Sequence, residues 1–522
     1  MAPTVRSCPT TRPSRASWRP FRASRGALGA LVAVLAELLS APAQARPSGA
    51  AAVCDAYPTS LTCAGRVPTC ALCHTSTGAA PDWNPFGYAV MGALADGAGY
   101  DGSDAGFRAA LPAALHRIEG DDDDDDGVSS LEELLLGTFP GDVDDVIRVP
   151  SPPQGPPNPV YAVGEWDPLF AFTRVAAAYC GASPTYEEKQ AFLGLARDAQ
   201  RRSVHAKLDR CLRSEHWRNA ELPSLADDRI RPVPRFEQWR WDYRLWRYAN
   251  LAPCDVDDDA CGDAAPRSAR DLLLGSYHVR ERVRGQLVRD PDNGAATATQ
   301  ACVDHSGCGF DEECGGGLCR VIGGGQPLQD ESRRAGMVTT TWFHFVNTMF
   351  SALPRTTAAA AYRAYLGHDL ARQEGLMAIP DEPADVDNKG VDGIGCQECH
   401  MHLDAAAYAF ASYRGIEAGG ASSYAADRPA ARGLWGPTAE PRQAFFFDVP
   451  VNDLVDWATH AADSEAFARH HTLTFFRHAV GREPRADELE ELAGVWRALD
   501  DDSFQTPAML HRLIDTRAFG AP

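Results

Sequence analysis

The chain has 522 residues, with 50 basic and 71 acidic side chains and a formal net charge of −21 at pH 7. An acidic surface of this size argues against nucleic acid and anionic lipid as partners, and it favours cationic partners or divalent cations. A chain of this length is expected to fold as several domains.

Residues 1–45 are predicted to be a secretory signal peptide. An arginine-rich start precedes an apolar run from about Gly26 to Leu39, and small residues offer a cleavage site after Ala45. No later segment approaches the roughly 18 consecutive apolar residues of a membrane-spanning helix. We therefore expect an exported chain without a transmembrane segment, in the periplasm, outside the cell or at its surface.

Residues 46–148 form the first predicted domain, which contains the motif Cys70-Ala-Leu-Cys73-His74. Cys-x-x-Cys-His is the attachment signature of a c-type haem, because the two thiols can each add to one vinyl group and the histidine then becomes the proximal iron ligand. A closed zinc site would need two such pairs at short separation, and a thioredoxin-like dithiol expects a strand-to-helix setting. Met91 is the candidate distal ligand, with His116 as the other nearby choice.

An acidic run in the same domain matches the calcium loop of an EF-hand. Oxygen donors at alternate positions, a glycine at the sixth position and a glutamate at the twelfth can wrap one hard cation. The alternative is a solvated acidic tract, in which the glycine and glutamate would have no role. The predicted calcium ligands are Asp122, Asp124, Asp126, Val128 through its carbonyl group, Ser130 and Glu133.

A Pro-rich linker over residues 149–160 is followed by a predicted helical domain over 161–300. Ser183 to Glu187 is typical of a helix start. The aromatic run from Trp239 to Tyr248 is interpreted as a buried helix core. A second acidic loop, between Cys254 and Cys261, is interpreted as a solvated loop.

The ten cysteines outside the leader and the haem motifs are an even number, which fits complete disulfide pairing in an oxidising compartment. Residues 301–330 are too short and polar to bury a core and are predicted to be a disulfide-rich insert. The spacing leaves connectivity open, and closeness in sequence suggests Cys54 with Cys63, Cys180 with Cys211, Cys254 with Cys261, and two bridges among Cys302, Cys308, Cys314 and Cys319.

Residues 331–435 form a second predicted haem region, which contains Cys396-Gln-Glu-Cys399-His400 and begins with an expected helix from Ala335 to Ala352. The final predicted domain, 436–522, is helical, with helices expected over Asn452–His471 and Ala486–Leu499. The candidate distal ligands of the second haem are Met337 and Met349, with His344, His368 and Met377 as further choices.

The order of these motifs resembles the multidomain cytochrome c proteins of planctomycete type, also abundant in myxobacteria. The resemblance covers most of residues 165–522, through segments such as Tyr179–Glu188, Leu208–Trp217, Arg334–Thr340 and Cys396–Gly415. Asp404 and Phe410 fit that family's pattern after the haem histidine, whereas Ala405 replaces its proline. The resemblance implies haem binding and electron transfer at the cell envelope, and little about a substrate.

Together these features predict a mainly α-helical, multidomain chain with cytochrome c-like haem modules, helical domains and a small disulfide-rich insert. The leading hypothesis is an exported electron carrier with two covalent haems and one structural calcium ion, whose redox partner proteins the sequence does not identify. A dihaem peroxidase is the enzymatic alternative, and it would need one haem with an open sixth position. A surface structural or binding protein with auxiliary haem is the third reading.

Overall fold

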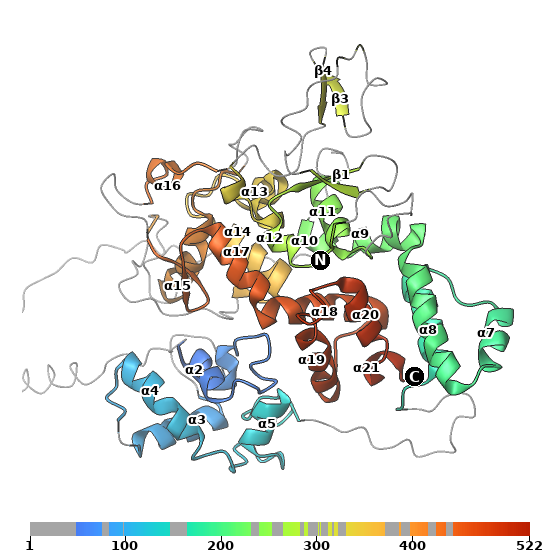
Figure 1. The fold of residues 1–522 in the computed structure, drawn as a ribbon. Helices are drawn as coiled ribbons and strands as arrows, with labels where there is room; N and C mark the ends of the chain where they lie inside the picture. Colours follow the sequence, from blue (N-terminus) through green and yellow to red (C-terminus); the bar gives the residue numbers. More distant parts are fainter. Residues whose placement is uncertain are drawn as a thin grey trace, which may run out of the picture. The chain divides into compact units, whose positions relative to one another are not determined.

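The computed structural model describes most of the chain from residue 48 onward. The described residues are 48–75, 83–97, 99–146, 164–230, 240–252, 265–281, 287–290, 301, 303, 312–315, 318–321, 330–370, 386–387, 397–415, 424–434 and 442–522. The predicted signal peptide, the Pro-rich linker, the acidic loop after Cys254, Met377 and Cys396 lie outside these residues. The described part is mainly α-helical, as predicted (Figure 1).

A hydrophobic core of its own lies within residues 52–134, built around buried Phe86, Val90, Leu111 and Leu134. Polar residues set where the helices begin, since the side chains of Asn84 and Ser103 accept hydrogen bonds from the first turns of α3 and α4. The Cys54–Cys63 disulfide joins α2 to the loop after it, as predicted. The helices of this N-terminal module are α2 (Ser48–Ala56), α3 (Pro85–Ala95), α4 (Asp104–Leu115) and α5 (Ser130–Leu136).

The described residues between 165 and 274 are mostly helical, and the expected helix start near Ser183 is confirmed. Thr185 and Glu188 form a reciprocal capping box at the beginning of α7. The predicted Cys180–Cys211 disulfide joins α6 to α8, and Trp246 and Tyr248 of the aromatic run are fully buried. The helices are α6 (Pro168–Cys180), α7 (Tyr186–Leu193), α8 (Arg197–Leu212), α9 (Leu222–Ser224), α10 (Asp227–Ile230), α11 (Arg240–Asn250) and α12 (Asp271–Leu274).

The domain predicted to be helical over 161–300 is not helical throughout, because β1 (His278–Glu281) and β2 (Leu287–Asp290) pair antiparallel. Their buried valine and leucine side chains pack on the main core, which outweighs weak local strand signals. Two further antiparallel pairs occur in the described residues, β3 (Glu312–Gly315) with β4 (Leu318–Val321) and β5 (Ala444–Phe446) with β6 (Val449–Val451). In the β3–β4 pair Cys314 lies opposite Cys319.

The single helix expected from Ala335 to Ala352 is also wrong. A 3₁₀ turn, η6 (Gly336–Thr339), is followed by Thr340, whose side chain caps the separate helix α13 (Thr341–Asn347). Gly336 has a φ of +45°, and a Cβ there would lie 2.2 Å from the carbonyl oxygen of Leu272, so close packing interrupts the helix. The region continues with α14 (Arg355–Ala361), η7 (Tyr362–Leu366), α15 (Gln397–Ala407) and α16 (Arg428–Ala431).

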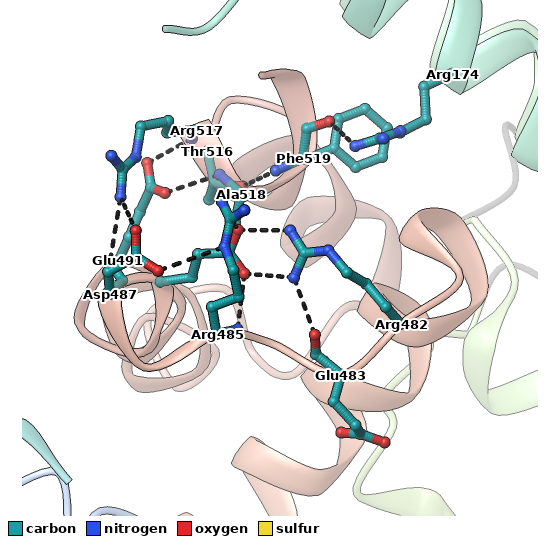
Figure 2. A network of polar contacts seen from close by, with 11 residues as sticks. Arg174, Arg482, Glu483, Arg485, Asp487, Glu491, Thr516, Arg517, Ala518 and Phe519 are labelled. Atoms are coloured by element: carbon teal, nitrogen blue, oxygen red, sulfur yellow. Dashed lines mark hydrogen bonds and ion pairs between the residues drawn. The ribbon is translucent and has the colours of Figure 1, made fainter. Parts of the chain in front are cut away.

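The C-terminal residues form a helical body in which Ser464 divides the helix expected over Asn452–His471. The Ser464 side chain caps the second helix. Buried Glu488 accepts paired hydrogen bonds from Arg482. Glu491 accepts from the backbone N–H groups of Arg517 and Ala518 (Figure 2). The helices are α17 (Leu454–Asp463), α18 (Glu465–Val480), α19 (Leu489–Arg497), α20 (Thr506–Leu513) and α21 (Arg517–Gly520). No helix in the described residues is long and apolar enough to cross a membrane.

Candidate functional site

The first Cys-x-x-Cys-His motif forms one tight turn. Residues Cys70–Leu72 make a 3₁₀ turn, and the backbone N–H groups of Cys73 and His74 both donate to the carbonyl oxygen of Cys70, at 3.2 and 3.0 Å. Leu72 is buried in the module core, which anchors the turn, while Cys70, Cys73 and His74 are half-buried. The turn therefore holds two sulfur atoms and one imidazole within five consecutive residues.

Asn84 ties this turn to the start of α3. Its backbone N–H donates to the Cys73 carbonyl oxygen at 3.0 Å, and its side-chain amide donates to the carbonyl oxygens of Ala71 and Leu72 at 3.1 and 3.0 Å. Its Oδ1 atom accepts from the N–H of Gly87 at 2.8 Å. A Cβ at Gly87 would lie 2.1 Å from the Cys73 carbonyl oxygen, so glycine permits the close approach.

The surroundings of the turn favour a neutral His74 ring and a protonated Cys73 thiol. The ring of His74 stacks on Trp83 with the centroids 4.2 Å apart, and burial lowers the pKa of His74, which favours the neutral imidazole. Cys70 and Cys73 are not in a disulfide bond. Burial and the neighbouring Cys70 raise the pKa of the Cys73 thiol to about 12, so this thiol is protonated in the metal-free turn.

The two distal candidates for this motif differ in their surroundings. Met91 lies on α3, is half-buried and packs against the same core as Cys73. His116 follows α4, and its Nδ1 atom lies 2.6 Å from Glu119 Oε1 and 3.3 Å from the Tyr57 hydroxyl. Of the two, Met91 is therefore the candidate whose ligand atom is not engaged by a carboxylate.

The described part of the second motif is on α15. It includes Cys399 and His400, and the Nδ1 atom of His400 is buried without a hydrogen-bond partner in the described residues. One turn further on, Asp404 is fully buried and binds Arg355, which also donates to both oxygens of Asp387 at 3.0 Å. Arg355 thus lies between two buried carboxylates next to His400.

The candidate distal ligands for the second motif differ in how far they are buried and in the contacts they make. Met337 is 1% exposed within the main core, whereas Met349 is 49% exposed and has a φ of +46°. His344 is buried, its ring stacks on Tyr413, and its Nε2 atom has no partner in the part of the chain described. His368 uses both nitrogens, since Nε2 accepts from the N–H of Val67 at 3.2 Å and Nδ1 lies 3.0 Å from the carbonyl oxygen of Leu366.

The predicted calcium loop brings three aspartates together. One carboxylate oxygen from each of Asp122, Asp124 and Asp126 lies within 4.8 Å of the others. The backbone folds inward, because the N–H groups of Gly127 and Val128 donate to Asp122 and Asp126 at 2.9 and 2.8 Å. The glycine has a φ of +94°, the left-handed conformation that this loop position requires.

Glu133 completes this acidic cluster from the first turn of α5. It is only 1% exposed, and its Oε2 atom and the Oδ2 atoms of Asp124 and Asp126 are buried without partners in the described residues. Burial, with the charges of Asp124 and Asp126, raises the pKa of Glu133 to about 8. Ser130, also predicted as a ligand, donates its hydroxyl to Asp123 Oδ2 at 2.8 Å.

Sequence reasoning missed several residues that surround these sites. Asn84 could have been recognised as a helix cap, since it comes directly before Pro85, the first residue of α3, but its contacts with the motif turn had no local signal. The stacking of Trp83 on His74 and the burial of Arg355 and Asp387 depend on tertiary packing.

No family model, no curated protein and no solved structure matches this chain.

Proposed function

We propose that this protein is an exported c-type cytochrome that holds two covalently attached haems and transfers electrons at the cell envelope, with a calcium ion in the acidic loop. The observation that carries the proposal is the geometry of the first motif, in which Cys70, Cys73 and His74 share one turn fastened by Asn84. The resemblance to planctomycete-type cytochromes agrees with it. The two disulfides are compatible with an oxidising compartment.

The residues of the first turn support this assignment by their chemistry. Protonated, half-buried thiols can add to vinyl groups, and a neutral His74 offers a nitrogen lone pair to iron. A bound haem would supply reversible one-electron chemistry. Trp83 restricts the His74 ring by stacking, and Asn84 fixes the backbone of the turn, so both residues hold the donor set in place.

The second motif is supported by His400, whose buried Nδ1 atom has no partner in the described residues. A histidine that ligates a metal through one nitrogen normally donates the N–H of the other to an oxygen acceptor, so Nδ1 can take that role while Nε2 binds iron. Arg355, Asp387 and Asp404 carry a net negative charge beside it, which would stabilise a cationic group. The proposed distal ligands remain Met91 for the first haem and Met337 or Met349 for the second.

Calcium is supported by Glu133 together with the three aspartates. Three aspartate carboxyl groups converge, Glu133 is close enough to feel the charges of two of them, and the unpartnered oxygens of Asp124, Asp126 and Glu133 are the hard donors that calcium prefers. A divalent cation would remove the repulsion among these groups. The loop therefore fits a structural calcium ion better than a solvated acidic tract.

Cysteine-pair variants test the proposal. The mature protein, produced with c-haem maturation, should carry two covalent haems by the pyridine haemochrome assay. Replacement of Cys70 and Cys73, or of Cys396 and Cys399, by alanine should leave one haem. The matched control replaces Cys180 and Cys211, which form a disulfide, and should keep both. If either motif variant also keeps two haems, the assignment of that motif is wrong.

The spectra of the same preparations separate electron transfer from peroxide reduction. Two low-spin haems with a reversible potential are expected of an electron carrier. One high-spin haem together with peroxide turnover would instead identify the protein as a dihaem peroxidase.

A further inference from the structure

The helix that follows the acidic loop is hydrogen-bonded to the segment that leads into the first haem motif. The backbone N–H groups of Leu61 and Thr62 donate to the carbonyl oxygens of Leu135 and Leu134 at 3.1 and 3.3 Å. These two acceptors lie on α5, a short helix whose first turn contains Glu133. The conformation of the loop and that of residues 61–62 are therefore tied through main-chain contacts.

The end of α5 strengthens this connection. Arg66 donates through its guanidinium to the carbonyl oxygen of Gly137 at 3.0 Å. Gly137 has a φ of +87°, and a Cβ there would lie 3.1 Å from Leu61 Cβ, so the helix end packs closely on the same segment. Only three residues separate Arg66 from Cys70, which leaves little chain to absorb a displacement.

A second connection runs through Asn84. A Cβ at Gly141, five residues beyond α5, would lie 2.6 Å from Asn84 Cγ, so this segment packs directly on the Asn84 side chain. The same side chain donates to the carbonyl oxygens of Ala71 and Leu72 inside the motif turn. Between Glu133 and Gly141, Thr138 donates its hydroxyl to Glu133 Oε1 at 3.3 Å.

Without a cation the acidic cluster opposes this arrangement. The carboxylates of Asp122, Asp124 and Asp126 repel one another, and the buried Glu133 carboxyl group beside them belongs to the first turn of α5. A helix of this length has little stability of its own. A cation that neutralises the cluster should hold α5 in place, and with it both connections to the motif turn.

We propose that calcium binding at the Asp122–Glu133 loop orders the Cys70–His74 turn, so that the acidic loop regulates the accessibility of the first haem-attachment site. This inference rests on the proposed function, because it assigns calcium to the loop and haem to the turn. Coupling between sites is reciprocal. If calcium raises the affinity of the turn for haem by some factor, haem bound at the turn raises the affinity of the loop for calcium by that same factor.

The test uses the haem-free mature chain with its disulfides intact. Cys70 and Cys73 are alkylated with N-ethylmaleimide in calcium or in EGTA, and the rate is read for each peptide by mass spectrometry. We expect calcium to slow alkylation of Cys73 at least tenfold and to leave the peptide of Cys396 and Cys399 within twofold. Glu133→Gln should abolish the effect. Asp125→Asn, which removes an exposed charge at a left-handed position that asparagine tolerates, should preserve it.

A second pair of variants addresses the connection through Asn84. Gly141→Ala should displace the Asn84 side chain, and we expect it to reduce the calcium effect on Cys73 at least threefold while terbium luminescence still reports an occupied loop. Gly92→Ala is the matched control, because nothing lies within 4 Å of the added Cβ.

The possible outcomes separate this inference from the proposed function. Calcium binding with unchanged Cys73 reactivity overturns the coupling and leaves the calcium site standing. Equal slowing of both motif peptides shows general stabilisation and also overturns it. Absence of calcium binding overturns the calcium assignment and the coupling together. Slowed alkylation in a protein that never acquires covalent haem supports the coupling and refutes the haem assignment.

Discussion

Asp242 provides a sharp test of the packing around α11. Its carboxyl group is 2% exposed, its Oδ2 atom accepts from the Thr340 hydroxyl at 2.7 Å, and its Oδ1 atom has no partner in the described residues. Burial raises the pKa of Asp242 to about 7, although the Thr340 hydrogen bond acts in the opposite direction. The folded protein therefore keeps a proton that the unfolded chain releases near pH 4.

The sign and size of the effect follow from this difference. Because the folded state binds more protons between about pH 4 and pH 7, the free energy of unfolding falls as the pH rises through this window. A shift of roughly three pKa units corresponds to a loss on the order of 4 kcal/mol above pH 7, which is absent below pH 4. Asp242→Asn mimics the protonated carboxyl group. It should therefore equal the wild type near pH 4 and exceed its stability at pH 8 by up to this amount.

Urea unfolding followed by far-ultraviolet circular dichroism at pH 4, 6 and 8 checks this prediction. Asp500→Asn, which changes an exposed aspartate, is the control and should follow the wild type at each pH. If the stability of Asp242→Asn falls with pH as steeply as that of the wild type, the argument from burial is refuted.

Two further substitutions test the surroundings of the two motifs. Arg355→Ala leaves Asp387 and Asp404 buried without their cation and should destabilise the protein by about 3–5 kcal/mol, whereas exposed Arg363→Ala should change its stability by less than about 1 kcal/mol. Equal thermal shifts for these two variants would contradict the buried network. Asn84→Ala removes a helix cap and two hydrogen bonds to the motif turn and should cost about 2–4 kcal/mol. Asn84→Asp keeps the cap and loses only the two hydrogen bonds to the motif turn. If calorimetry shows that Asn84→Ala itself loses only about 1 kcal/mol of stability, which is the usual cost of a lost cap alone, the turn does not depend on this side chain.

The features that the sequence predicts well are those fixed by short-range chemistry. The helix start near Ser183 and the two close disulfides depend on residues near in sequence, and each is confirmed. The clustering of Asp122, Asp124 and Asp126 follows from alternating positions in one loop. Local spacing is sufficient for these features, since few alternative geometries are open to them.

The features that the sequence missed depend on contacts between distant segments. The helix expected from Ala335 is interrupted because Gly336 packs on the backbone of α12. The strands near Val279 are stabilised by the main core rather than by their own propensity. Likewise, no local pattern indicated that Asn84 fastens the motif turn, or that Gly141 packs on Asn84.

The central claim is that Cys70 with Cys73, and Cys396 with Cys399, each attach one haem. The most direct measurement is the intact mass of the mature protein, denatured after production in a host with c-haem maturation. The proposal predicts an increase equal to two haems that survives denaturation and acid extraction. A mass equal to that of the polypeptide alone would contradict it.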